Sequence, residues 1–348
     1  MERVINTGLA AYGMSGKVFH APLIETHSGF RLSKILERHS NESTKKYPHV
    51  NIVRTFEELL TDNEIELIVV NTPDHLHYNM VSQAIKAGKH VIAEKPFTQT
   101  TKQALELDKL ANEKGVMVSV FQNRRWDGDF LTVKKVIEEN LVGRLVEFEA
   151  HFDRFRNYTK PNTWKEDPAT GTGTLYNLGS HMIDQALVLF GMPSTVQADI
   201  RTMRTGGSVD DNFELKLGYE SEKVTLKGSY LVREPGPRYI LHGTEGSFLK
   251  WGLDPQEAAL TDGELPDKPG WGEEDSRYYG LLNTDINGLH FKGKIETIAG
   301  NYLAFYDDIY NALTTGIKPA VTAIQASDVI RIIEAAFESH ENQKAVLL

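Results

Sequence analysis

The fold is decided near the N-terminus by the stretch Val4-Ile5-Asn6-Thr7-Gly8-Leu9-Ala10-Ala11-Tyr12-Gly13-Met14-Ser15-Gly16. A short apolar run leads into residues 11–16, which follow the dinucleotide-loop pattern G-x-G-x-x-G with alanine in the first position. In this pattern Gly13 lets the backbone approach a pyrophosphate, and Gly16 lets the next helix pack closely on the strand. Amides near Met14 and Ser15 would face the phosphates, with Tyr12 beside them. Alone, the pattern fits an ordinary glycine turn equally well.

Strand-like and helix-like segments alternate through the first third of the chain. The expected strands are Val4–Ala11, Phe30–Leu36, Asn51–Val53, Leu67–Asn71, His90–Ala93 and Val116–Phe121. Between them, Tyr78–Ala87 and Thr101–Lys114 have helical patterns that Gly88 and Gly115 would end. This alternation predicts βαβ units and a parallel sheet.

The segment Gly88-Lys89-His90-Val91-Ile92-Ala93-Glu94-Lys95-Pro96 places a lysine directly after a buried strand. Open α/β sheets bind their ligands at the carboxyl ends of the strands, so Lys95 is a candidate functional residue. Pro96 cannot continue a central strand, because it donates no hydrogen bond to the sheet.

An acidic and a basic residue follow the second expected strand. Glu37 comes about 20 residues after the glycine loop, where an acid would hold the ribose hydroxyls of NAD. Arg38 could instead stack on adenine or attract the 2′-phosphate of NADP. Glu37 could also be a solvated charge. The acid slightly favours NAD, and the choice between NAD and NADP stays open.

The segment Asp74-His75-Leu76-His77 resembles a metal-binding sequence only superficially. Residues two apart do not share a helix face, and no further ligands cluster with them, so we expect no metal site. We expect Thr72, Pro73 and His77 to line the cofactor pocket instead.

After about residue 122 the pattern changes to one of alternating polar and apolar residues. Phe213–Tyr219 and Val224–Tyr230 have this period of two, which predicts antiparallel strands with one apolar face. Residues 243–246 form an expected turn, and Tyr302–Leu313 and Ile324–Ser339 are expected helices. The prediction is an α/β Rossmann domain at 1–122 and an α+β domain with a large, mainly antiparallel sheet at 123–348.

The composition narrows the classes of function. The formal net charge of −10 argues against nonspecific binding to nucleic acids or anionic membranes. The absence of cysteine excludes disulfides, thiolate metal sites and cysteine nucleophiles. The sequence shows neither a signal peptide nor an apolar stretch of about 20 residues, so we expect a soluble cytoplasmic protein.

Several motifs together resemble one family. They are Gly-Lys-Val-Phe-His-Ala-Pro-Leu-Ile after the glycine loop, Ala-Gly-Lys-His-Val-Ile-Ala-Glu-Lys-Pro at residues 87–96, and Gly-Thr-Gly-Thr-Leu-Tyr-Asn-Leu-Gly-Ser-His-Met-Ile-Asp at residues 171–184. They are similar to motifs of the glucose–fructose oxidoreductase, inositol dehydrogenase and MocA family. Residues 121–130 and 319–322 are similar to the subgroup that includes NADP-dependent scyllo-inositol dehydrogenases.

The resemblance implies hydride transfer between a secondary alcohol of a polyol or sugar and a nicotinamide. It implies that Lys95, often followed by a cis peptide bond, and His181 act at the carbon being oxidised. It places Glu94 beside the cofactor. The family usually has an aspartate four residues before the histidine, but this chain has Asn177.

The pattern around His181 agrees with this implication. Apolar residues of 175–187 recur at helical spacing, so Asn177 and His181 fall one turn apart on a shared face. Gly179 inside this helix costs about 1 kcal/mol against alanine, which suggests close approach of a ligand or of the chain. A histidine can take a proton as hydride leaves, and a lysine ammonium can stabilise negative charge on oxygen. A structural histidine capped by Asp184 is the alternative.

Polyol recognition needs side chains that form hydrogen bonds. The candidates for substrate binding are Arg124, which follows the last strand of the first domain, and Arg154, Tyr158 and Trp164 in the second domain. Asn123, next to Arg124, is a candidate for cofactor binding. Arg154 could equally be a surface charge of its strand.

Two rival functions remain open. One is a non-catalytic regulator that binds NAD(P), which Asn177 favours and the retained Lys95 and His181 oppose. The other is a lyase or glycosidase that uses tightly bound NAD. We also expect a homodimer or homotetramer, because the outer face of the second sheet carries apolar residues beyond the needs of the core.

Overall fold

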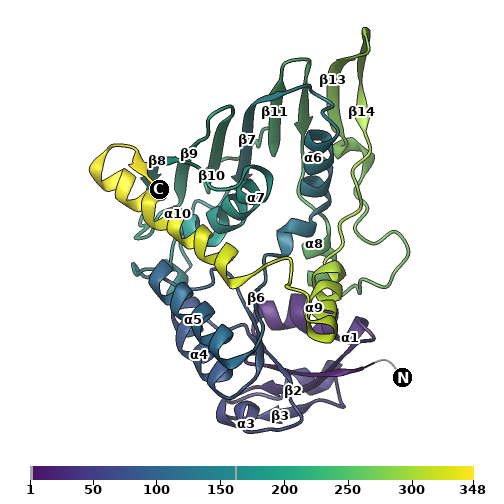
Figure 1. Cartoon of the computed structure of the whole chain (residues 1–348), viewed down its shortest axis with the longest axis vertical. Helices are drawn as coiled ribbons and strands as arrows, with labels where there is room; N and C mark the ends of the chain where they lie inside the picture. Colours follow the sequence, from purple (N-terminus) through teal and green to yellow (C-terminus); the bar gives the residue numbers. More distant parts are fainter. Residues whose placement is uncertain (1–2, 161–162) are drawn as a thin grey trace. The chain divides into compact units, whose positions relative to one another are not determined.

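The computed structural model describes residues 3–160 and 163–348. The chain packs as two compact units (Figure 1). The first unit consists of Met1–Trp126, Pro255–Trp271 and Asn301–Ser327, and the second of Asp127–Asp254, Gly272–Gly300 and Asp328–Leu348. Two later segments thus contribute Leu260, Tyr302 and Phe305 to the first core, and the division at residue 122 stays a prediction.

The first unit is built on a parallel sheet. Within the described residues its strands are β1 (Ile5–Leu9), β2 (Phe30–Leu36), β3 (Asn51–Val53), β4 (Leu67–Val70), β5 (His90–Ala93) and β6 (Val118–Val120). They lie in the order β3-β2-β1-β4-β5-β6, and all the pairings are parallel. This is the strand order of dinucleotide-binding Rossmann sheets, so the predicted fold of this domain is confirmed.

The first unit also contains helices and helical turns. They are η1 (Gly16–His20), α1 (Ala21–Thr26), α2 (Ser43–Lys46), α3 (Glu57–Leu60), η2 (Asp74–Leu76), α4 (His77–Lys86), α5 (Thr101–Lys114), η3 (Asn123–Trp126), α8 (Gln256–Thr261) and α9 (Leu303–Thr315). The side chain of Thr100 accepts a hydrogen bond from the Gln103 amide at the start of α5. Gly115 ends that helix with φ 65°, a left-handed conformation that favours glycine.

The helix after the glycine loop does not begin as an ordinary α-helix. Residues 16–20 form a π-helical turn, in which the Ala21 amide donates to the carbonyl of Gly16. The sequence predicted the helix but not this wider turn, which has no simple periodic signal.

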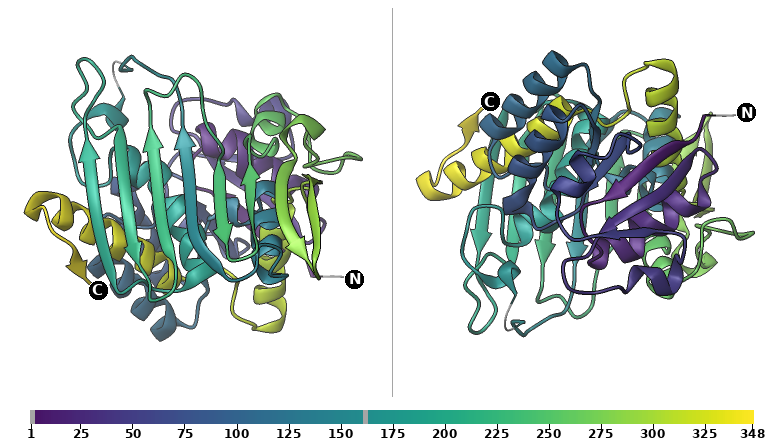
Figure 2. Two further views of the ribbon diagram at one scale, coloured as in Figure 1. Left: turned by 90° about the horizontal axis from the view of Figure 1, so that it is seen from above. Right: turned by 90° about the horizontal axis from the view of Figure 1, so that it is seen from below.

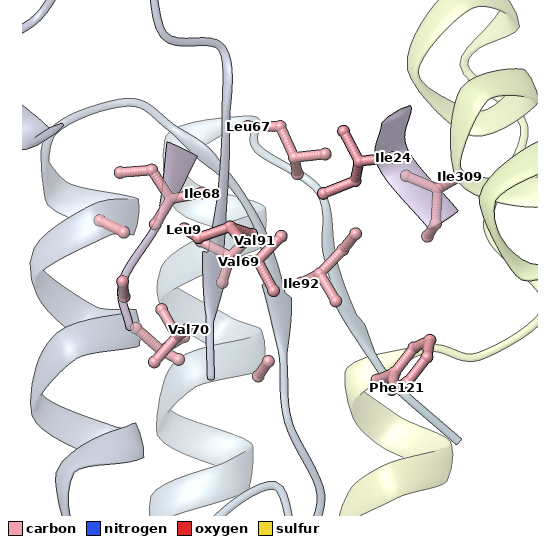
Figure 3. Packing of buried hydrophobic residues seen from close by; sticks show 14 of the residues in the cluster. Leu9, Ile24, Leu67, Ile68, Val69, Val70, Val91, Ile92, Phe121 and Ile309 are labelled. Carbon is pink, nitrogen blue, oxygen red and sulfur yellow. The ribbon is translucent and has the colours of Figure 1, made fainter. Parts of the chain in front are cut away.

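The core of the first unit consists of fully buried aliphatic residues from the central strands. Leu9, Val69 and Ile92 lie on adjacent strands, and Ile24 and Ile309 lie on helices (Figure 3). Strands β4 and β5 are buried on both faces, which explains why their sequences are continuously apolar.

The second unit contains a larger, mixed sheet. Its strands are β7 (Leu145–Asp153), β8 (Thr195–Arg201), β9 (Asn212–Gly218), β10 (Lys223–Ser229), β11 (Tyr239–Gly243), β12 (Gly246–Lys250), β13 (Gly280–Ile286), β14 (Leu289–Ile295) and β15 (Val346–Leu347). The order is β14-β13-β12-β11-β7-β10-β9-β8-β15. Strands β7 and β10 pair in parallel and the other pairings are antiparallel, so the predicted mainly antiparallel sheet is confirmed.

Helices cover one face of this mixed sheet (Figure 2). The helical elements are α6 (Gly128–Glu138), η4 (Trp164–Glu166), η5 (Leu175–Gly179), α7 (Ser180–Phe190), η6 (Ser276–Tyr278) and α10 (Ala323–Asn342), which begins in the first unit. Buried residues of α7, such as Met182 and Ile183, pack with Phe213 of β9 and Leu226 of β10.

The other face of the mixed sheet carries more charge than the sequence suggested. His151 of β7 lies between Glu149, at 3.1 Å, and Asp153, at 3.4 Å, and Lys227 of β10 lies 3.4 Å from Glu149. The partly exposed apolar residues of this face lie on neighbouring strands: Ile240, Leu249 and Leu281. This face therefore combines charged residues on the central strands with apolar residues on β11, β12 and β13, and the homodimer or homotetramer stays a prediction.

Candidate active site

The glycine loop is held in place by an asparagine on the neighbouring strand. Asn71 directly follows β4, and its Nδ2 donates to the carbonyl of Ala11 at 2.8 Å. In return, the amide of Ala11 donates to Oδ1 of Asn71 at 3.0 Å. Strands β1 and β4 flank the point where the strand order reverses, so Asn71 fixes the loop where such sheets bind nucleotides. The apolar pattern predicted a strand end at Asn71 but no role for its side chain.

The two glycines of the loop meet different surroundings. A Cβ atom on Gly16 would lie 2.6 Å from the carbonyl oxygen of Ala11, so this residue must be glycine for the helix to approach the strand. A Cβ atom on Gly13 would meet nothing within 4 Å among the described residues. The space beside Gly13 suits a ligand that approaches the backbone, as the motif predicts.

The other loop residues lie close to the surface. Met14 is 61% exposed, and Ser15 and Tyr12 are partly buried. The Lys17 ammonium lies 5.5 Å from the centre of the Tyr12 ring. Burial, together with the charges of Glu37 and Glu42, raises the pKa of the Tyr12 hydroxyl.

The carboxylate of Glu37 is occupied by its own loop. It accepts hydrogen bonds from the amides of Glu42, at 2.8 Å, and Ser43, at 2.9 Å, and from the hydroxyls of Ser40 and Ser43. Burial alone would raise the pKa of Glu37, but these donors lower it overall. The carboxylate therefore organises residues 40–43, and its expected contact with the ribose stays a prediction. Arg38, next to it, is exposed.

The imidazole of His77 meets one backbone carbonyl from the segment after β4 and one from the segment after β5. Its Nε2 lies 2.8 Å from the carbonyl oxygen of Thr72, and its Nδ1 lies 2.9 Å from that of Pro96. His77 is 1% exposed and binds backbone between two loops, and its place in the lining of the cofactor pocket stays a prediction. The hydroxyl of Thr72 is buried without a hydrogen-bond partner among the described residues, and Pro73 is partly exposed.

Glu94 and Lys95 directly follow β5, at the same edge of the sheet. The Glu94 carboxylate accepts hydrogen bonds from the hydroxyl of Ser15, from His20 and from the amide of Lys95. Lys95 is partly exposed, and its peptide bond to Pro96 is cis, as the family resemblance suggests. The lysine thus lies next to the glycine loop.

Asn123 and Arg124 lie in η3, which follows β6. Both are buried. The guanidinium of Arg124 forms an ion pair with Glu257 of α8, in the same unit. This ion pair was not predicted, and it gives Arg124 a structural contact in addition to the substrate contact that was expected.

Asn177 and His181 lie on one continuous helical stretch in the second unit. Asn177 belongs to the π-helical turn η5, and His181, which is 4% exposed, belongs to α7. A Cβ on Gly179 would lie 2.6 Å from the side chain of Leu175 and 3.4 Å from Phe213. The close approach at this glycine is therefore made by the chain and not by a ligand.

An aspartate that the sequence analysis missed caps this helical stretch. Oδ2 of Asp210 accepts a hydrogen bond from the amide of Leu175 at 2.8 Å. A Cβ on Gly173 would lie 1.8 Å from Oδ1 of Asp210, so Gly173 makes room for the carboxyl group. Burial raises the pKa of Asp210 to about 6, despite the hydrogen bonds from the backbone.

A buried arginine anchors the segment that holds two of the expected substrate residues. Arg204 forms ion pairs with Glu166 and Asp211, both at 2.9 Å, and donates to the carbonyl of Tyr158 at 2.9 Å. The side chain of Tyr158 itself is 55% exposed. Trp164, on η4, is partly buried. Arg204 was not predicted, because its partners lie far apart in the sequence.

Arg154 directly follows β7. Its guanidinium lies 5.0 Å from the centre of the Phe152 ring, and Phe152 is fully buried in the core of the second unit. This contact favours a role inside the unit over the alternative of a charge on the open face of the sheet.

The residues of the first unit fit a bound dinucleotide. The space beside Gly13 and the buried hydroxyl of Thr72 lie where the strand order reverses. Within residues 3–160 and 163–348, no three His, Asp or Glu side chains gather as metal ligands, and no helix is long and apolar enough to cross a membrane.

Comparisons with known proteins agree with this geometry. Residues 5–122 match the NAD-binding Rossmann fold of the oxidoreductase family, and residues 134–348 match its C-terminal alpha/beta domain. The scyllo-inositol 2-dehydrogenase (NADP(+)) IolW of Bacillus subtilis is 41% identical over 345 residues, covering 99% of this chain and 96% of that protein. An uncharacterized oxidoreductase of Escherichia coli, YdgJ, is 38% identical over 352 residues, covering all of both chains.

The structural comparison gives the same result. A crystal structure of a Bacteroides fragilis protein described as an oxidoreductase has a TM-score of 0.93 and 52% sequence identity, covering 99% of this chain and 100% of its own. A Bacillus subtilis oxidoreductase structure, YvaA, has a TM-score of 0.97 at 40% identity, covering 100% of this chain and 99% of its own. The chain therefore belongs to the glucose–fructose oxidoreductase, inositol dehydrogenase and MocA family of oxidoreductases.

Proposed function

We propose that this protein is a dehydrogenase that moves a hydride between a secondary hydroxyl of a cyclic polyol or sugar and a nicotinamide dinucleotide. One observation carries the proposal: the carboxylate of Glu94 binds both Ser15 of the glycine loop and the amide of Lys95. The dinucleotide loop and the candidate catalytic lysine are therefore neighbours at the carboxyl edge of the first sheet. The name of the Bacillus subtilis relative, an inositol dehydrogenase, supports the choice of substrate.

The roles of the side chains follow from their chemistry. The Lys95 ammonium would donate a hydrogen bond to the reacting oxygen and stabilise its developing negative charge. His181 would accept the proton of the alcohol. Asn177 can donate and accept hydrogen bonds but cannot take a proton. The bound dinucleotide would supply the hydride acceptor.

We further propose that NADP is preferred to NAD. The carboxylate of Glu37 already accepts four hydrogen bonds from its own loop, so it is poorly placed to accept two more from a ribose. The exposed guanidinium of Arg38 suits the 2′-phosphate. This reverses the slight preference for NAD that the acid suggested, and the NADP(+) in the name of the relative supports the change.

The substrate pocket would draw on the second unit. Arg154, Tyr158 and Trp164 would hold the hydroxyl groups and one apolar face of the ring. Arg204 would contribute indirectly, because it binds the carbonyl of Tyr158 and pairs with Glu166.

The test is a panel of inositols and sugars with NAD and NADP separately, following the absorbance of the reduced nicotinamide. We expect reduction of NADP with at least one cyclic polyol. Lys95→Met should abolish turnover while dinucleotide affinity stays within about threefold, and Lys86→Met, an exposed lysine at the end of α4, should leave both unchanged. Dinucleotide binding without turnover of any substrate in the panel would favour the regulator. Product formation without net reduction of the dinucleotide would favour the lyase or glycosidase.

A further inference from the structure

A buried carboxylate in the first unit receives hydrogen bonds from three directions. Oε1 of Glu94 accepts from the hydroxyl of Ser15 and lies 3.1 Å from Nε2 of His20. Oε2 accepts from the amide of Lys95 at 3.0 Å. The Glu94 side chain is 11% exposed, so these groups of the chain replace water around it.

The direction of the hydrogen bonds to Glu94 can be assigned. Burial alone would raise the pKa of Glu94, but hydrogen bonds and charge from His20, Ser15 and Lys95 lower it to about 2, so the group is a carboxylate and only accepts. Nε2 of His20 must therefore carry a proton. The hydroxyl of Tyr306 lies 2.7 Å from Nδ1 of His20, and burial raises its pKa well above the usual value, so the hydroxyl stays protonated.

His20 therefore links Tyr306 to Glu94 through its two ring nitrogens. Its Nε2 donates to Glu94, and its Nδ1 shares the second hydrogen bond with the Tyr306 hydroxyl. Both the His20 and Tyr306 side chains are fully buried, and the His20 ring packs 4.4 Å from that of Phe121. Neither residue is exposed, so both can influence a bound ligand only through the groups that they position.

We propose that Glu94 is a positioning residue that couples the glycine loop to Lys95, and that His20 and Tyr306 hold its carboxylate in place. This rests on the proposed function for the part that Lys95 plays. One carboxylate fixes both Ser15 and the Lys95 backbone. A substitution of His20 or Tyr306, which hold this carboxylate, therefore disturbs both dinucleotide binding and the environment of the lysine. A hydrogen bond to a charged group contributes enough that its loss corresponds to roughly a 10- to 100-fold change in an equilibrium constant.

The experiment uses the full chain carrying His20→Asn or Tyr306→Phe. The second variant removes a single oxygen atom and keeps the test open if His20→Asn does not fold. Asp307→Asn is the matched control, since Asp307 follows Tyr306 on α9 and also pairs with a histidine, His27, at 3.0 Å, but on the surface. Two measurements are made on each protein: the Kd for NADPH by fluorescence titration, and the pH dependence of acetylation at Lys95, followed by mass spectrometry.

We expect His20→Asn to weaken NADPH binding at least tenfold and to move the labelling curve of Lys95, with smaller changes in the same directions for Tyr306→Phe. Asp307→Asn should match the wild type in both measurements. The coupling does not exist if folded variants at positions 20 and 306 keep both the wild-type Kd and the wild-type labelling curve. It does not exist either if only one of these two measurements changes. Neither readout needs turnover, so failure to oxidise a polyol would refute the proposed function and leave this test valid.

Discussion

The side chain of Asn71 forms two hydrogen bonds with the backbone of Ala11, one to its amide and one to its carbonyl, and so joins the ends of β1 and β4. Asn71→Leu has a similar volume but satisfies neither group. An unsatisfied buried polar group costs about 1–3 kcal/mol, so we expect dinucleotide affinity to fall about tenfold or more. Fluorescence titration with NADPH measures this. Asn112→Leu, on the exposed side of α5, should bind as the wild type does; equal affinity of Asn71→Leu would show that the loop does not need this support.

Alanine substitutions at the two loop glycines should have different effects, one on the stability of the fold and the other on dinucleotide binding. Gly16→Ala places a Cβ 2.6 Å from the carbonyl of Ala11, and overpacking of this kind typically costs about 1–3 kcal/mol, so its Tm should fall. Gly13→Ala meets open space, so its Tm should stay close to that of the wild type while NADPH affinity falls. Differential scanning fluorimetry with and without NADPH distinguishes the two effects. A ligand-induced increase in Tm of normal size in Gly13→Ala would argue against close approach of a ligand at this residue.

Coenzyme preference should depend on Arg38. Arg38→Ala removes an exposed cation next to the loop that Glu37 organises, so the Kd for NADP should rise about tenfold or more while that for NAD stays nearly constant. Arg31→Ala removes an exposed arginine of β2 away from that loop and serves as the control. Calorimetric titration with both dinucleotides measures the ratio. A parallel change for NAD and NADP would mean that Arg38 does not contact the 2′-phosphate.

The first sheet could be predicted closely because its signals are local. Strands β2, β3 and β5 begin and end at the expected residues, and α5 ends at Gly115 as its glycine suggested. Each of these boundaries depends on a few neighbouring residues and on the apolar period. The alternation of polar and apolar residues likewise predicted β9 and β10, which pair antiparallel.

The side-chain partners could not be predicted in this way. The motif placed Glu37 at the end of its strand, but nothing in the pattern indicated that Ser40 and Ser43 would occupy its carboxylate. His20 and Tyr306 are 286 residues apart, and no periodic signal links them. Whether Lys95 and His181 meet over one substrate stays a prediction, which the panel and the Lys95→Met variant address.

Asn177 stands where related enzymes usually have an aspartate. If a carboxylate at this position helps to offset the charge of the lysine, Asn177→Asp should raise kcat/KM several-fold and move the pH profile of kcat. Steady-state kinetics on the best substrate of the panel, from pH 6 to 10, measure both quantities. The control is Asn79→Asp, which adds the same charge at an exposed position of α4. An unchanged kcat/KM at position 177 would mean that the residue has no electrostatic role.

Asp210 should make the protein less stable as the pH rises through the mildly acidic range. Its pKa is raised from 3.8 to about 6 by burial, so its contribution to stability is complete below about pH 4 and is lost as the pH rises to about 6 and beyond. The shift corresponds to at most about 3 kcal/mol. Asp210→Asn still accepts a hydrogen bond from the Leu175 amide but cannot ionise, so its Tm should lack this decline between pH 4 and 7.

The matched control for this prediction is Asp199→Asn. A hydrogen bond with Arg201 lowers the pKa of Asp199, so its contribution is lost as the pH falls and the sign of the effect is opposite. Tm values of the wild type, Asp210→Asn and Asp199→Asn, measured at half-unit steps of pH, test this prediction. Asp210 caps the helical stretch that carries Asn177 and His181. If the decline in Tm persists in Asp210→Asn, the group that causes it lies elsewhere, and this helix end does not contribute to the pH dependence of stability.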